Sequence, residues 1–387
     1  MHFTLSNEQA QIRDSVARMI EAVTELPRDG FSAESYARTW GVFAGLGIAG
    51  LCIEEANGGF SGAAEDIMLL ACELGRAPMK TPRFETIVMA GRLLAGAASG
   101  SATGWRDGLI AGEAQIAVAF AEGDDPAGLS APTLTAVPDG DGYRLLGEKV
   151  LVIGGGTADC LVVSAILPSG ELALLMVEPS LPNVQRADYR LADTTPVADV
   201  DFRAVRVDSG ALLARGDAAQ TLLDDARAFA IMAQCAADVG GMAEAISLTI
   251  EHLKTRQQFG RTLAELQVLQ HRVADMFIAT NNARSSVYAA TAALSGAPEA
   301  RRSAASRCKI AIARASKAVI GEALHLHGGI GITTEYPVGH LYRRALVDDQ
   351  LLGDVERHLA MLTRVDSCTD DLADAGTIGE KACAAAA

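Results

Sequence analysis

A cluster of glycines in segment 324–354 marks a place where a ligand could approach the backbone closely. Gly328, Gly329 and Gly331 lie within four positions directly after an apolar run, and Pro337 follows near the start of the next helical pattern. Glycine permits a sharp turn and leaves room that a side chain would fill. On its own, such a cluster is more often a plain helix-ending turn than a binding loop.

Acidic residues follow the same segment and are weak candidates for a general base, a group that takes a proton during catalysis. Asp348, Asp349 and Asp354 lie on the last helical pattern, and Asp238 lies in an apolar stretch of an earlier one. A spacing of four places Asp348 and Leu352 on one face of a continuous helix. Acidic residues on a late helix are usually solvated, so the sequence favours a surface role for them.

Composition and charge narrow the class of protein. The chain has 387 residues, 49% of them hydrophobic, which is ample for a large core. Its 48 acidic residues outnumber 33 basic ones and give a net charge of −15, which argues against nucleic acid as a partner. No apolar run approaches the roughly 18–20 residues of a membrane span, and the N-terminus has no apolar core of the signal-peptide type. We therefore expect a soluble, cytoplasmic protein.

The seven cysteines do not form a metal-binding or redox pattern. Their number is odd. Zinc and redox motifs require cysteines within about four positions of each other, and no two cysteines of this chain are that close. We expect reduced, mostly buried thiols and no metal site.

The sequence predicts three folded parts and a tail. Residues 1–113 show helical periodicity, 114–215 contain short β-type runs separated by turn signals, and 216–365 return to helical periodicity. The β-type runs predict a small antiparallel sandwich or barrel. The last part predicts a four-helix bundle, with helices over residues 217–252, 263–295, 299–325 and 338–362. Residues 366–387 are small and polar or alanine-rich, which predicts a disordered tail.

Four sequence blocks in these parts carry a resemblance to a known protein family. They are ANGGFSG, GEKVLVIGGGTAD, KTRQQFGRTLAELQVLQHRVADM and LHGGIGITTEYPVGHLYRRA, which occur in family order and at family spacing. From about Phe3 to Arg364 the chain resembles the acyl-CoA dehydrogenase family. Within the family it is most similar to the small partner subunits of heteromeric members, such as that of pimeloyl-CoA dehydrogenase. The resemblance implies a mostly α fold with a central antiparallel β domain and a C-terminal four-helix bundle.

The resemblance also implies a reaction. Family enzymes bind FAD across a subunit interface and introduce an α,β double bond into an acyl-CoA thioester. A carboxylate takes the α proton while hydride leaves the β carbon for the flavin, and the electrons pass to an electron-transferring flavoprotein. The weakly acidic C–H bond needs a base held close in a dry site, and the flavin accepts the hydride.

Residues that hold the adenosine half of FAD in the family are largely kept. By resemblance, the arginine of RQQFG reaches a neighbouring subunit's pyrophosphate, for which a guanidinium fork is suited. Without the wider match, this arginine would be interpreted as an exposed charge at a helix end. The predicted cofactor-binding residues are Arg256, Phe259, Gln267, His325, Gly328 and Gly329.

Residues that face the flavin ring and the substrate are largely lost. The family's catalytic glutamate falls on Leu352, and the alternative base position falls on Ala230. The T-E-P turn reads Ala-Glu-Gly at 121–123, and the W-I-T strand reads Leu-Val-Ile at 151–153. Residues 124–127, Asp-Asp-Pro-Ala, replace a glycine-serine phosphate loop, and carboxylates beside a pyrophosphate are repulsive unless offset. No catalytic residue is therefore retained at a family position.

This asymmetric loss favours one interpretation over two others. The favoured one is a partner subunit in an α2β2-type hetero-oligomer, which lends the adenosine side of a shared FAD site while a second acyl-CoA dehydrogenase chain supplies base and flavin pocket. The first alternative is a scaffold or acyl-binding protein without flavin. The second is a homo-oligomeric dehydrogenase with a displaced aspartate base.

Overall fold

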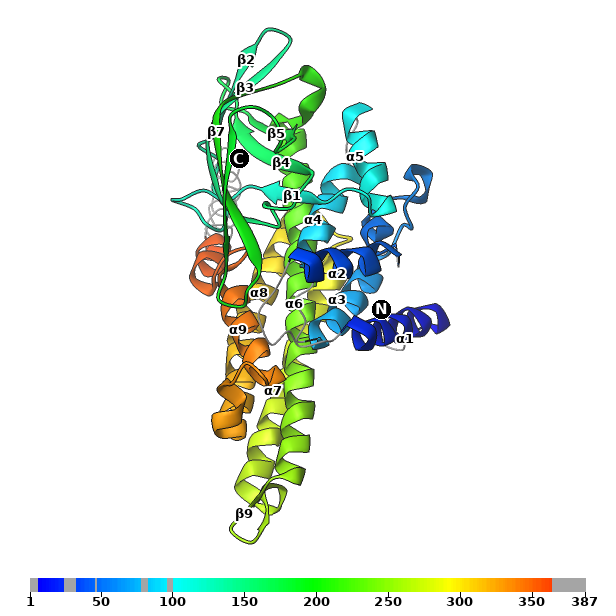
Figure 1. The fold of residues 1–387 in the computed structure, drawn as a ribbon, viewed down its shortest axis with the longest axis vertical. Helices are drawn as coiled ribbons and strands as arrows, with labels where there is room; N and C mark the ends of the chain where they lie inside the picture. The colour runs from blue at the N-terminus through cyan, green and yellow to red at the C-terminus, as the bar shows by residue number, and fades with distance from the viewer. Residues whose placement is uncertain (1–5, 24–32, 46, 78–82, 96–99, 364–387) are drawn as a thin grey trace, which may run out of the picture.

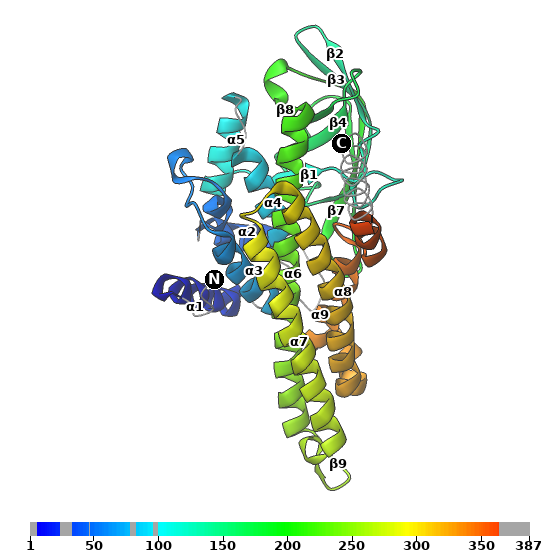
Figure 2. The ribbon, with the colours of Figure 1, turned by 180° about the vertical axis from the view of Figure 1, so that it is seen from behind.

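The computed structural model describes residues 6–23, 33–45, 47–77, 83–95 and 100–363, so the predicted tail at 366–387 lies outside the described residues. The molecule is elongated, with a β-sheet toward one end and a helical bundle that extends to the other (Figure 1). Figure 2 shows from behind that the N-terminal helices lie beside the middle of one long helix. The predicted order of helices, sheet and bundle is confirmed.

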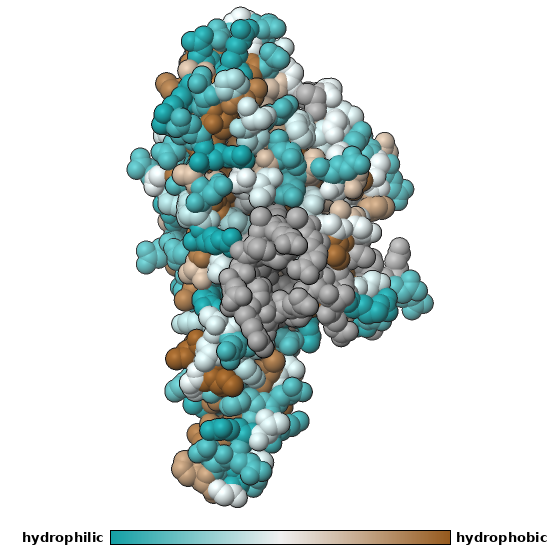
Figure 3. Space-filling model, in the orientation of Figure 1, coloured by the Kyte–Doolittle hydropathy of each residue, from teal (hydrophilic) through white to brown (hydrophobic). Residues whose placement is uncertain are grey.

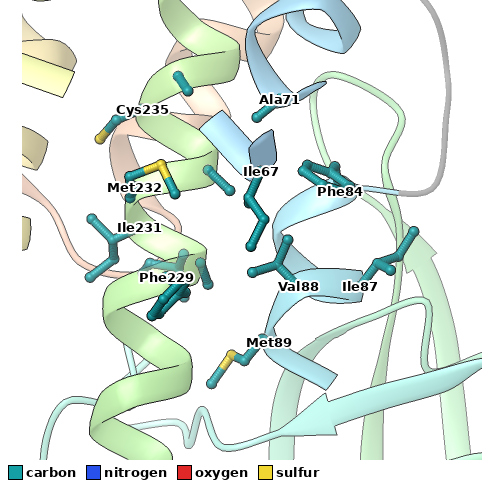
Figure 4. Packing of buried hydrophobic residues seen from close by; sticks show 14 of the residues in the cluster. Ile67, Ala71, Phe84, Ile87, Val88, Met89, Phe229, Ile231, Met232 and Cys235 are labelled. Carbon is teal, nitrogen blue, oxygen red and sulfur yellow. The ribbon is translucent and has the colours of Figure 1, made fainter. Parts of the chain in front are cut away.

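The N-terminal helices pack against that long helix, α6 (Gly216–Thr255). The first helix begins with a capping box, because Ser6 and Gln9 exchange side-chain to backbone hydrogen bonds of 3.1 and 3.2 Å. Side chains of the third and fourth helices, such as Ile67 and Val88, point toward α6 (Figure 4). The elements of this part are α1 (Asn7–Val23), α2 (Ala33–Gly45), η1 (Ile48–Cys52), η2 (Glu55–Asn57), α3 (Ala64–Arg76), α4 (Phe84–Ala95) and α5 (Gly100–Ala111).

The central sheet has eight strands and is mixed rather than purely antiparallel. Its order is β6-β7-β3-β2-β4-β5-β8, and β1 pairs in parallel with β4. One parallel pair also joins β2 to β4, so the antiparallel prediction is wrong for these pairs. The side chains of strand β6 are mostly polar and exposed, so its sequence shows no apolar alternation. The strands are β1 (Ile116–Ala119), β2 (Thr135–Asp139), β3 (Gly142–Ile153), β4 (Cys160–Ile166), β5 (Leu172–Val177), β6 (Val184–Arg190), β7 (Pro196–Val207) and β8 (Leu212–Arg215).

Three further helices complete the bundle with α6, and the last of them is shorter than predicted. Helix α9 ends at Gln350, and a separate helix covers residues 355–363. Between them Leu352 and Gly353 take φ values of 58° and 101°, which no α-helix accommodates. The bundle helices are α7 (Gln267–Ala293), α8 (Pro298–His327) and α9 (Pro337–Gln350), with a hairpin of β9 (Gln257–Gln258) and β10 (Arg261–Thr262) and the 3-10 helices η3 (Ser209–Ala211), η4 (Leu263–Glu265) and η5 (Gly328–Ile332).

Helix α6 is the central core element. In the part of the chain that the structure describes, it is the one helix long and apolar enough to cross a membrane, but 83% of its apolar window is buried inside the protein. On the face shown in Figure 3, the exposed surface of the bundle is mostly hydrophilic, with small hydrophobic groups among the polar ones. The apolar character of α6 is therefore explained by burial on all sides.

Two glycines allow α3 and α6 to touch backbone to backbone. A Cβ atom at Gly240 would collide with the carbonyl oxygen of Cys72, and one at Gly75 would collide with that of Ala237. The neighbouring Gly241 has its nearest foreign atom, the Gly75 oxygen, at an ordinary 3.5 Å. Close approach at this crossing thus depends on the first two glycines and not on the third.

We expect Gly240→Ala to lower the free energy of unfolding by about 2 kcal/mol or more, because overpacking against a fixed backbone costs about 1–3 kcal/mol. Gly241→Ala is the matched control and should be neutral or stabilising by up to about 1 kcal/mol, the gain in helix propensity. Urea denaturation of both variants measures the difference. Equal stabilities would show that the helix crossing relaxes freely.

Candidate functional site

A small cavity lies where the N-terminal helices, the sheet and the bundle meet. Its volume is about 30 Å³, which is room for one water molecule. The two positions at which the family carries a base, Leu352 and Ala230, both line it. Ala121 and Leu151, which replace flavin-facing family residues, line it from the sheet. The fold therefore brings the predicted catalytic positions together, but around a nearly closed space.

Backbone strain persists at two of these positions although their side chains are apolar. Leu352 and Leu151 have φ values of 58° and 53°, a left-handed conformation that costs an ordinary residue about 1–2 kcal/mol. The backbone amide of Leu151 donates a 3.1 Å hydrogen bond to Asp199, whose carboxylate also accepts one of 2.8 Å from Tyr189. The main chain is thus held in a left-handed conformation at two positions whose side chains are apolar.

Two buried groups hold the turn that carries Leu352. Lys309 on α8 donates to the carbonyl oxygen of Leu351 at 2.7 Å and also to that of Asp348. The Nε2 atom of His358 donates to the Leu352 carbonyl at 2.9 Å, while its Nδ1 lies 3.1 Å from the Ser306 hydroxyl. Burial lowers the pKa of His358 to about 4, so the ring is neutral at pH 7.

A buried network of charges lies beside the cavity and is centred on Arg83, just before α4. Its guanidinium donates to Glu85 at 2.5 Å and to Asp193 at 2.9 Å, and it also contacts Asp348. Thr195 accepts a further hydrogen bond at 3.2 Å. Burial alone would lower the pKa of Arg83, but Glu85 and Asp193 outweigh it and raise that pKa.

The bundle side of this network contains two more cations. Arg344 lies 3.4 Å from the Asp348 carboxylate and donates to the carbonyl oxygen of Ala237 at 2.9 Å. Lys309 donates to Gln234 at 2.8 Å, and burial lowers the pKa of its ammonium group. Asp238 is buried nearby, and desolvation raises its pKa to about 6 although Arg344, Lys309 and Arg83 act against the shift.

The weak base candidates have structural roles instead. Asp348 is 2% exposed and is engaged by Arg83, Arg344 and Gln234, and it does not line the cavity. Asp349 pairs with Lys317 at 2.8 Å. Asp354 accepts a 2.8 Å hydrogen bond from the backbone amide of Arg357 and caps the helix that follows. The predicted common face of Asp348 and Leu352 is wrong, because α9 ends between them.

Glu85 is the one acidic residue among the described residues that line the cavity, and the sequence interpretation overlooked it. Its carboxylate is held by Arg83 at 2.5 Å, so it is not a free base. Arg83 and Lys309 were overlooked as well. Charged residues beside strongly apolar runs, as in PRFETIVMA and RCKIAIA, were the available signal, since such charges are buried only when paired.

On the sheet side, the glutamate of the former T-E-P turn is a structural anchor. Glu122 accepts hydrogen bonds from Lys149 at 2.6 Å and from the backbone amides of Thr133 and Leu134 at 2.8 and 3.1 Å. Burial opposes its ionisation, but these donors outweigh that effect and lower the pKa of Glu122 to about 2. Burial lowers the pKa of Lys149 to about 8, and Glu122 offsets part of the shift.

The acidic replacement of the phosphate loop is offset within the chain. Asp125 contacts Arg357 of the last described helix and accepts a 2.6 Å hydrogen bond from the backbone amide of Ser130. Burial would raise the pKa of Asp125, but these two partners lower it. Arg227 of α6 donates to the carbonyl oxygen of Gly128 in the same loop. The loop is therefore tied to the bundle by the groups that surround it.

At the other end of the bundle, Arg256 and Phe259 point away from the protein. Phe259 is 87% exposed at the tip of the β9–β10 hairpin, with φ values of 56° for itself and 74° for Gly260, as a tight hairpin turn requires. Arg256 is exposed, and its guanidinium makes no hydrogen bond or ion pair with any described residue. An aromatic ring presented in this strained way is typical of a binding surface.

The remaining predicted cofactor residues lie at the same end. Gln267 begins α7 and is exposed, and His325 near the end of α8 lies 3.0 Å from Arg272. Gly328, with a φ of 62°, and Gly329 are exposed and have nothing within 4 Å of an added Cβ atom. This open backbone leaves space for a ligand or another chain to approach closely.

A stack of histidine rings joins these residues to the hairpin. His252, one turn before Arg256 on α6, stacks on His327 with ring centroids 4.6 Å apart. His327 directly precedes Gly328, and its Nε2 lies 3.2 Å from the hydroxyl of Tyr336. Burial lowers the pKa of both histidines. The stack fixes the end of α6 against the glycine turn.

Comparison with known proteins identifies relatives with a similar sequence and fold. The family profile of the acyl-CoA dehydrogenase C-terminal domain matches residues 214–365. The chain is 27% identical to acryloyl-CoA reductase (NADH) of Anaerotignum propionicum, covering 94% of this chain and 95% of the relative. It is also 27% identical to the acyl-CoA dehydrogenase IpdE2 of Mycolicibacterium smegmatis, covering 92% and 98%. It superposes on a solved variant of the Tcur3481-Tcur3483 steroid ACAD with a TM-score of 0.84 at 27% identity, covering 95% and 100%.

The helices, central sheet and four-helix bundle define an acyl-CoA dehydrogenase fold. Residues 214–365 match the acyl-CoA dehydrogenase C-terminal domain, and over most of its length the chain is similar to members of that family, which are FAD-dependent oxidoreductases.

The two halves of the family's cofactor fit this chain differently. At the adenosine end, an unpaired guanidinium, an exposed aromatic ring and an open glycine turn suit a nucleotide. At the ring end, a cavity of about 30 Å³ does not suit a flavin, since small-molecule sites usually measure about 300–1,000 Å³. Within one copy of this chain, only the adenosine-side residues fit FAD.

We expect the buried carboxyl of Asp238 to make stability depend on pH. Its pKa rises from 3.8 to about 6 on folding, so between these values the folded state keeps a proton that the unfolded state releases. Stability from this group is present below pH 4 and falls as pH rises to 6, by about 3 kcal/mol. In Asp238→Asn this contribution is removed. Urea denaturation of both proteins at pH 4, 5, 6 and 7 measures the difference between their free energies of unfolding. This difference should shrink by about 3 kcal/mol as pH rises, and a constant difference would contradict a raised pKa for Asp238.

Proposed function

We propose that this chain is the non-catalytic partner subunit of a heteromeric FAD-dependent acyl-CoA dehydrogenase, of the kind represented by the small subunit of pimeloyl-CoA dehydrogenase. It contributes Arg256, Phe259, Gln267, His325, Gly328 and Gly329 to the adenosine side of an FAD whose ring lies in the other subunit. That second subunit supplies the catalytic carboxylate and takes the acyl-CoA substrate. The complex introduces an α,β double bond into the thioester in an α2β2-type assembly.

The observation that carries this proposal is the contrast between the two ends of the chain. The adenosine-side residues are exposed, and the guanidinium of Arg256 makes no hydrogen bond or ion pair with any described residue, whereas His325 contacts Arg272 at 3.0 Å. The base positions, Leu352 and Ala230, carry no group that takes a proton and line a cavity of about 30 Å³. A chain that lends one half of a cofactor site and lacks the other is expected to act beside a complete partner.

The substrate class and the electron acceptor follow from the family. An acyl-CoA thioester is the substrate, and an electron-transferring flavoprotein in the cytoplasm receives the electrons. One relative of 27% identity is a steroid ACAD whose name joins two chains, which supports a paired assembly. The displaced-base alternative is weakened because Asp348 is engaged by two arginines and Asp349 by Lys317.

A scaffold without flavin is the second candidate. The small cavity favours it, but the strained, exposed Phe259 and the open Gly328–Gly329 turn do not, since a scaffold has no need of an exposed aromatic ring beside an open backbone.

We expect the chain expressed alone to be colourless or to carry far less than one FAD per chain. Coexpression with a family member that carries the glutamate and the T-E-P and W-I-T elements should give a yellow complex. Absorbance at the flavin band against protein concentration measures both. One tightly bound FAD per lone chain would exclude the partner-subunit role.

We expect Arg256→Ala to lower FAD retention of the complex about ten- to hundredfold, since a charge-assisted bond to phosphate is worth about 1.5–3 kcal/mol. Lys254→Ala, which removes an exposed cation two positions earlier, is the control and should retain FAD as the parent does. Equilibrium dialysis of FAD at fixed salt compares the three complexes, and circular dichroism checks that folding is unchanged. Equal retention in both variants would show that Arg256 is only a surface charge.

A further inference from the structure

Arg83 links the sheet to the bundle across the edge of the closed cavity. Its guanidinium binds Asp193 at 2.9 Å in the turn 191–195 between β6 and β7, and it contacts Asp348 near the end of α9. It also binds Glu85 on α4, which lines the cavity. One cation thus joins residues of all three parts of the chain at the place where they meet.

This link resists separation because all its charges are buried. The side chains of Arg83, Asp193 and Asp348 are 8%, 6% and 2% exposed. Moving the sheet away from the bundle would leave Asp193 or the guanidinium without its partner in a medium of low dielectric, which is strongly unfavourable. Arg344 remains beside Asp348 in that event, so the loss falls mainly on the sheet side of the link.

A second link closes the cavity from the other side. Asp125 of the former phosphate loop contacts Arg357 of helix 355–363, and the next residue, Pro126, lines the cavity. The cavity wall therefore includes Glu85 beside one ionic link and Pro126 beside the other. Ala121 and Leu151 from the sheet face Ala230 and Leu352 from the bundle in the space between.

We propose that Arg83 is a lock between sheet and bundle, whose pairing with Asp193 and Asp348 keeps the cavity of this chain too small for a flavin ring or an acyl chain. The lock rests on the proposed function, for which it supplies a physical cause. The chain excludes the reacting half of the cofactor because its walls are held together, in addition to lacking a base.

The test measures opening of the cavity in the purified full-length chain. Arg83→Met removes the charge and keeps the length of the side chain, and Asp193→Asn removes only the sheet-side charge. In the parent the amides of Thr195 and Leu191 are held by hydrogen bonds of 3.0 Å each, to the Asp193 carboxylate and the Thr195 carbonyl oxygen. We expect hydrogen exchange of segment 191–195 to accelerate at least tenfold in Arg83→Met and several-fold in Asp193→Asn. Binding of the apolar dye 8-anilinonaphthalene-1-sulfonate should increase in both.

Arg92→Met is the matched control. Arg92 lies on α4, the helix that follows Arg83, and pairs with Asp225 of α6 at 2.6 Å, so its loss removes an ion pair between α4 and the bundle without touching the sheet. Exchange of segment 191–195 should remain at the parent rate in this variant. An equal acceleration in Arg92→Met, or parent exchange and dye binding in both lock variants, would overturn the lock.

Two further controls keep the outcome interpretable. Circular dichroism establishes that each variant is folded, and if Arg83→Met does not fold, Asp193→Asn decides the question alone. Exchange and dye binding require no flavin. A lone parent chain with one bound FAD would therefore overturn both the proposed function and the lock, whereas unchanged exchange and dye binding in the variants would overturn the lock and leave the proposed function standing.

Discussion

Burial of charge at the junction of the three parts is the constraint on which the rest of the structure depends. Three cations and four carboxylates lie near one another in an otherwise apolar interior, and each is stable there only with a partner. Because the partners come from α4, the 191–195 turn, α6, α8 and α9, satisfying the charges fixes how these elements meet. The members of this network are Arg83, Glu85, Asp193, Asp238, Lys309, Arg344 and Asp348.

The same network explains why an active-site backbone survives without active-site chemistry. Lys309 holds the carbonyl oxygens of Asp348 and Leu351, and His358 holds that of Leu352, so the turn keeps its left-handed residue. By the resemblance, this turn is the predicted position of a catalytic carboxylate. Here it presents leucine to a cavity that holds no more than a water. The hydrogen bonds that shape the turn involve backbone atoms, so they do not depend on which side chain the turn carries.

The two ends of the molecule therefore differ in how many polar and aromatic groups have partners within the chain. At the junction, Arg83, Arg344 and Asp348 are paired within the chain, and Lys309 donates to Gln234 and to backbone carbonyl oxygens. At the hairpin end, Phe259 and Arg256 extend into solvent, and the glycine turn at Gly328 leaves its backbone open. Exposing a large aromatic ring to water in a strained conformation is costly for an isolated chain. The cost is offset when the ring and the guanidinium are covered by a ligand or a second subunit.

The sequence by itself determined the order of helices, sheet and bundle, because apolar periodicity is local and reports which face each segment buries. Counting along the motifs also predicts that Leu352 and Ala230 occupy the family's base positions. Domain limits at 113, 215 and 365 and the cofactor roles of Arg256 and its companions stay predictions.

Only the tertiary structure decided the parallel pairing of β1 with β4, the end of α9 at Gln350 and the near closure of the cavity. Arg83, Asp193 and Asp348 are separated by more than a hundred positions, and no local pattern shows that they meet. Their pairing follows from the topology of the sheet and bundle. The physical reason is that apolar periodicity shows which face of a single helix or strand is buried. The partners of a buried charge depend instead on which elements the fold places next to it.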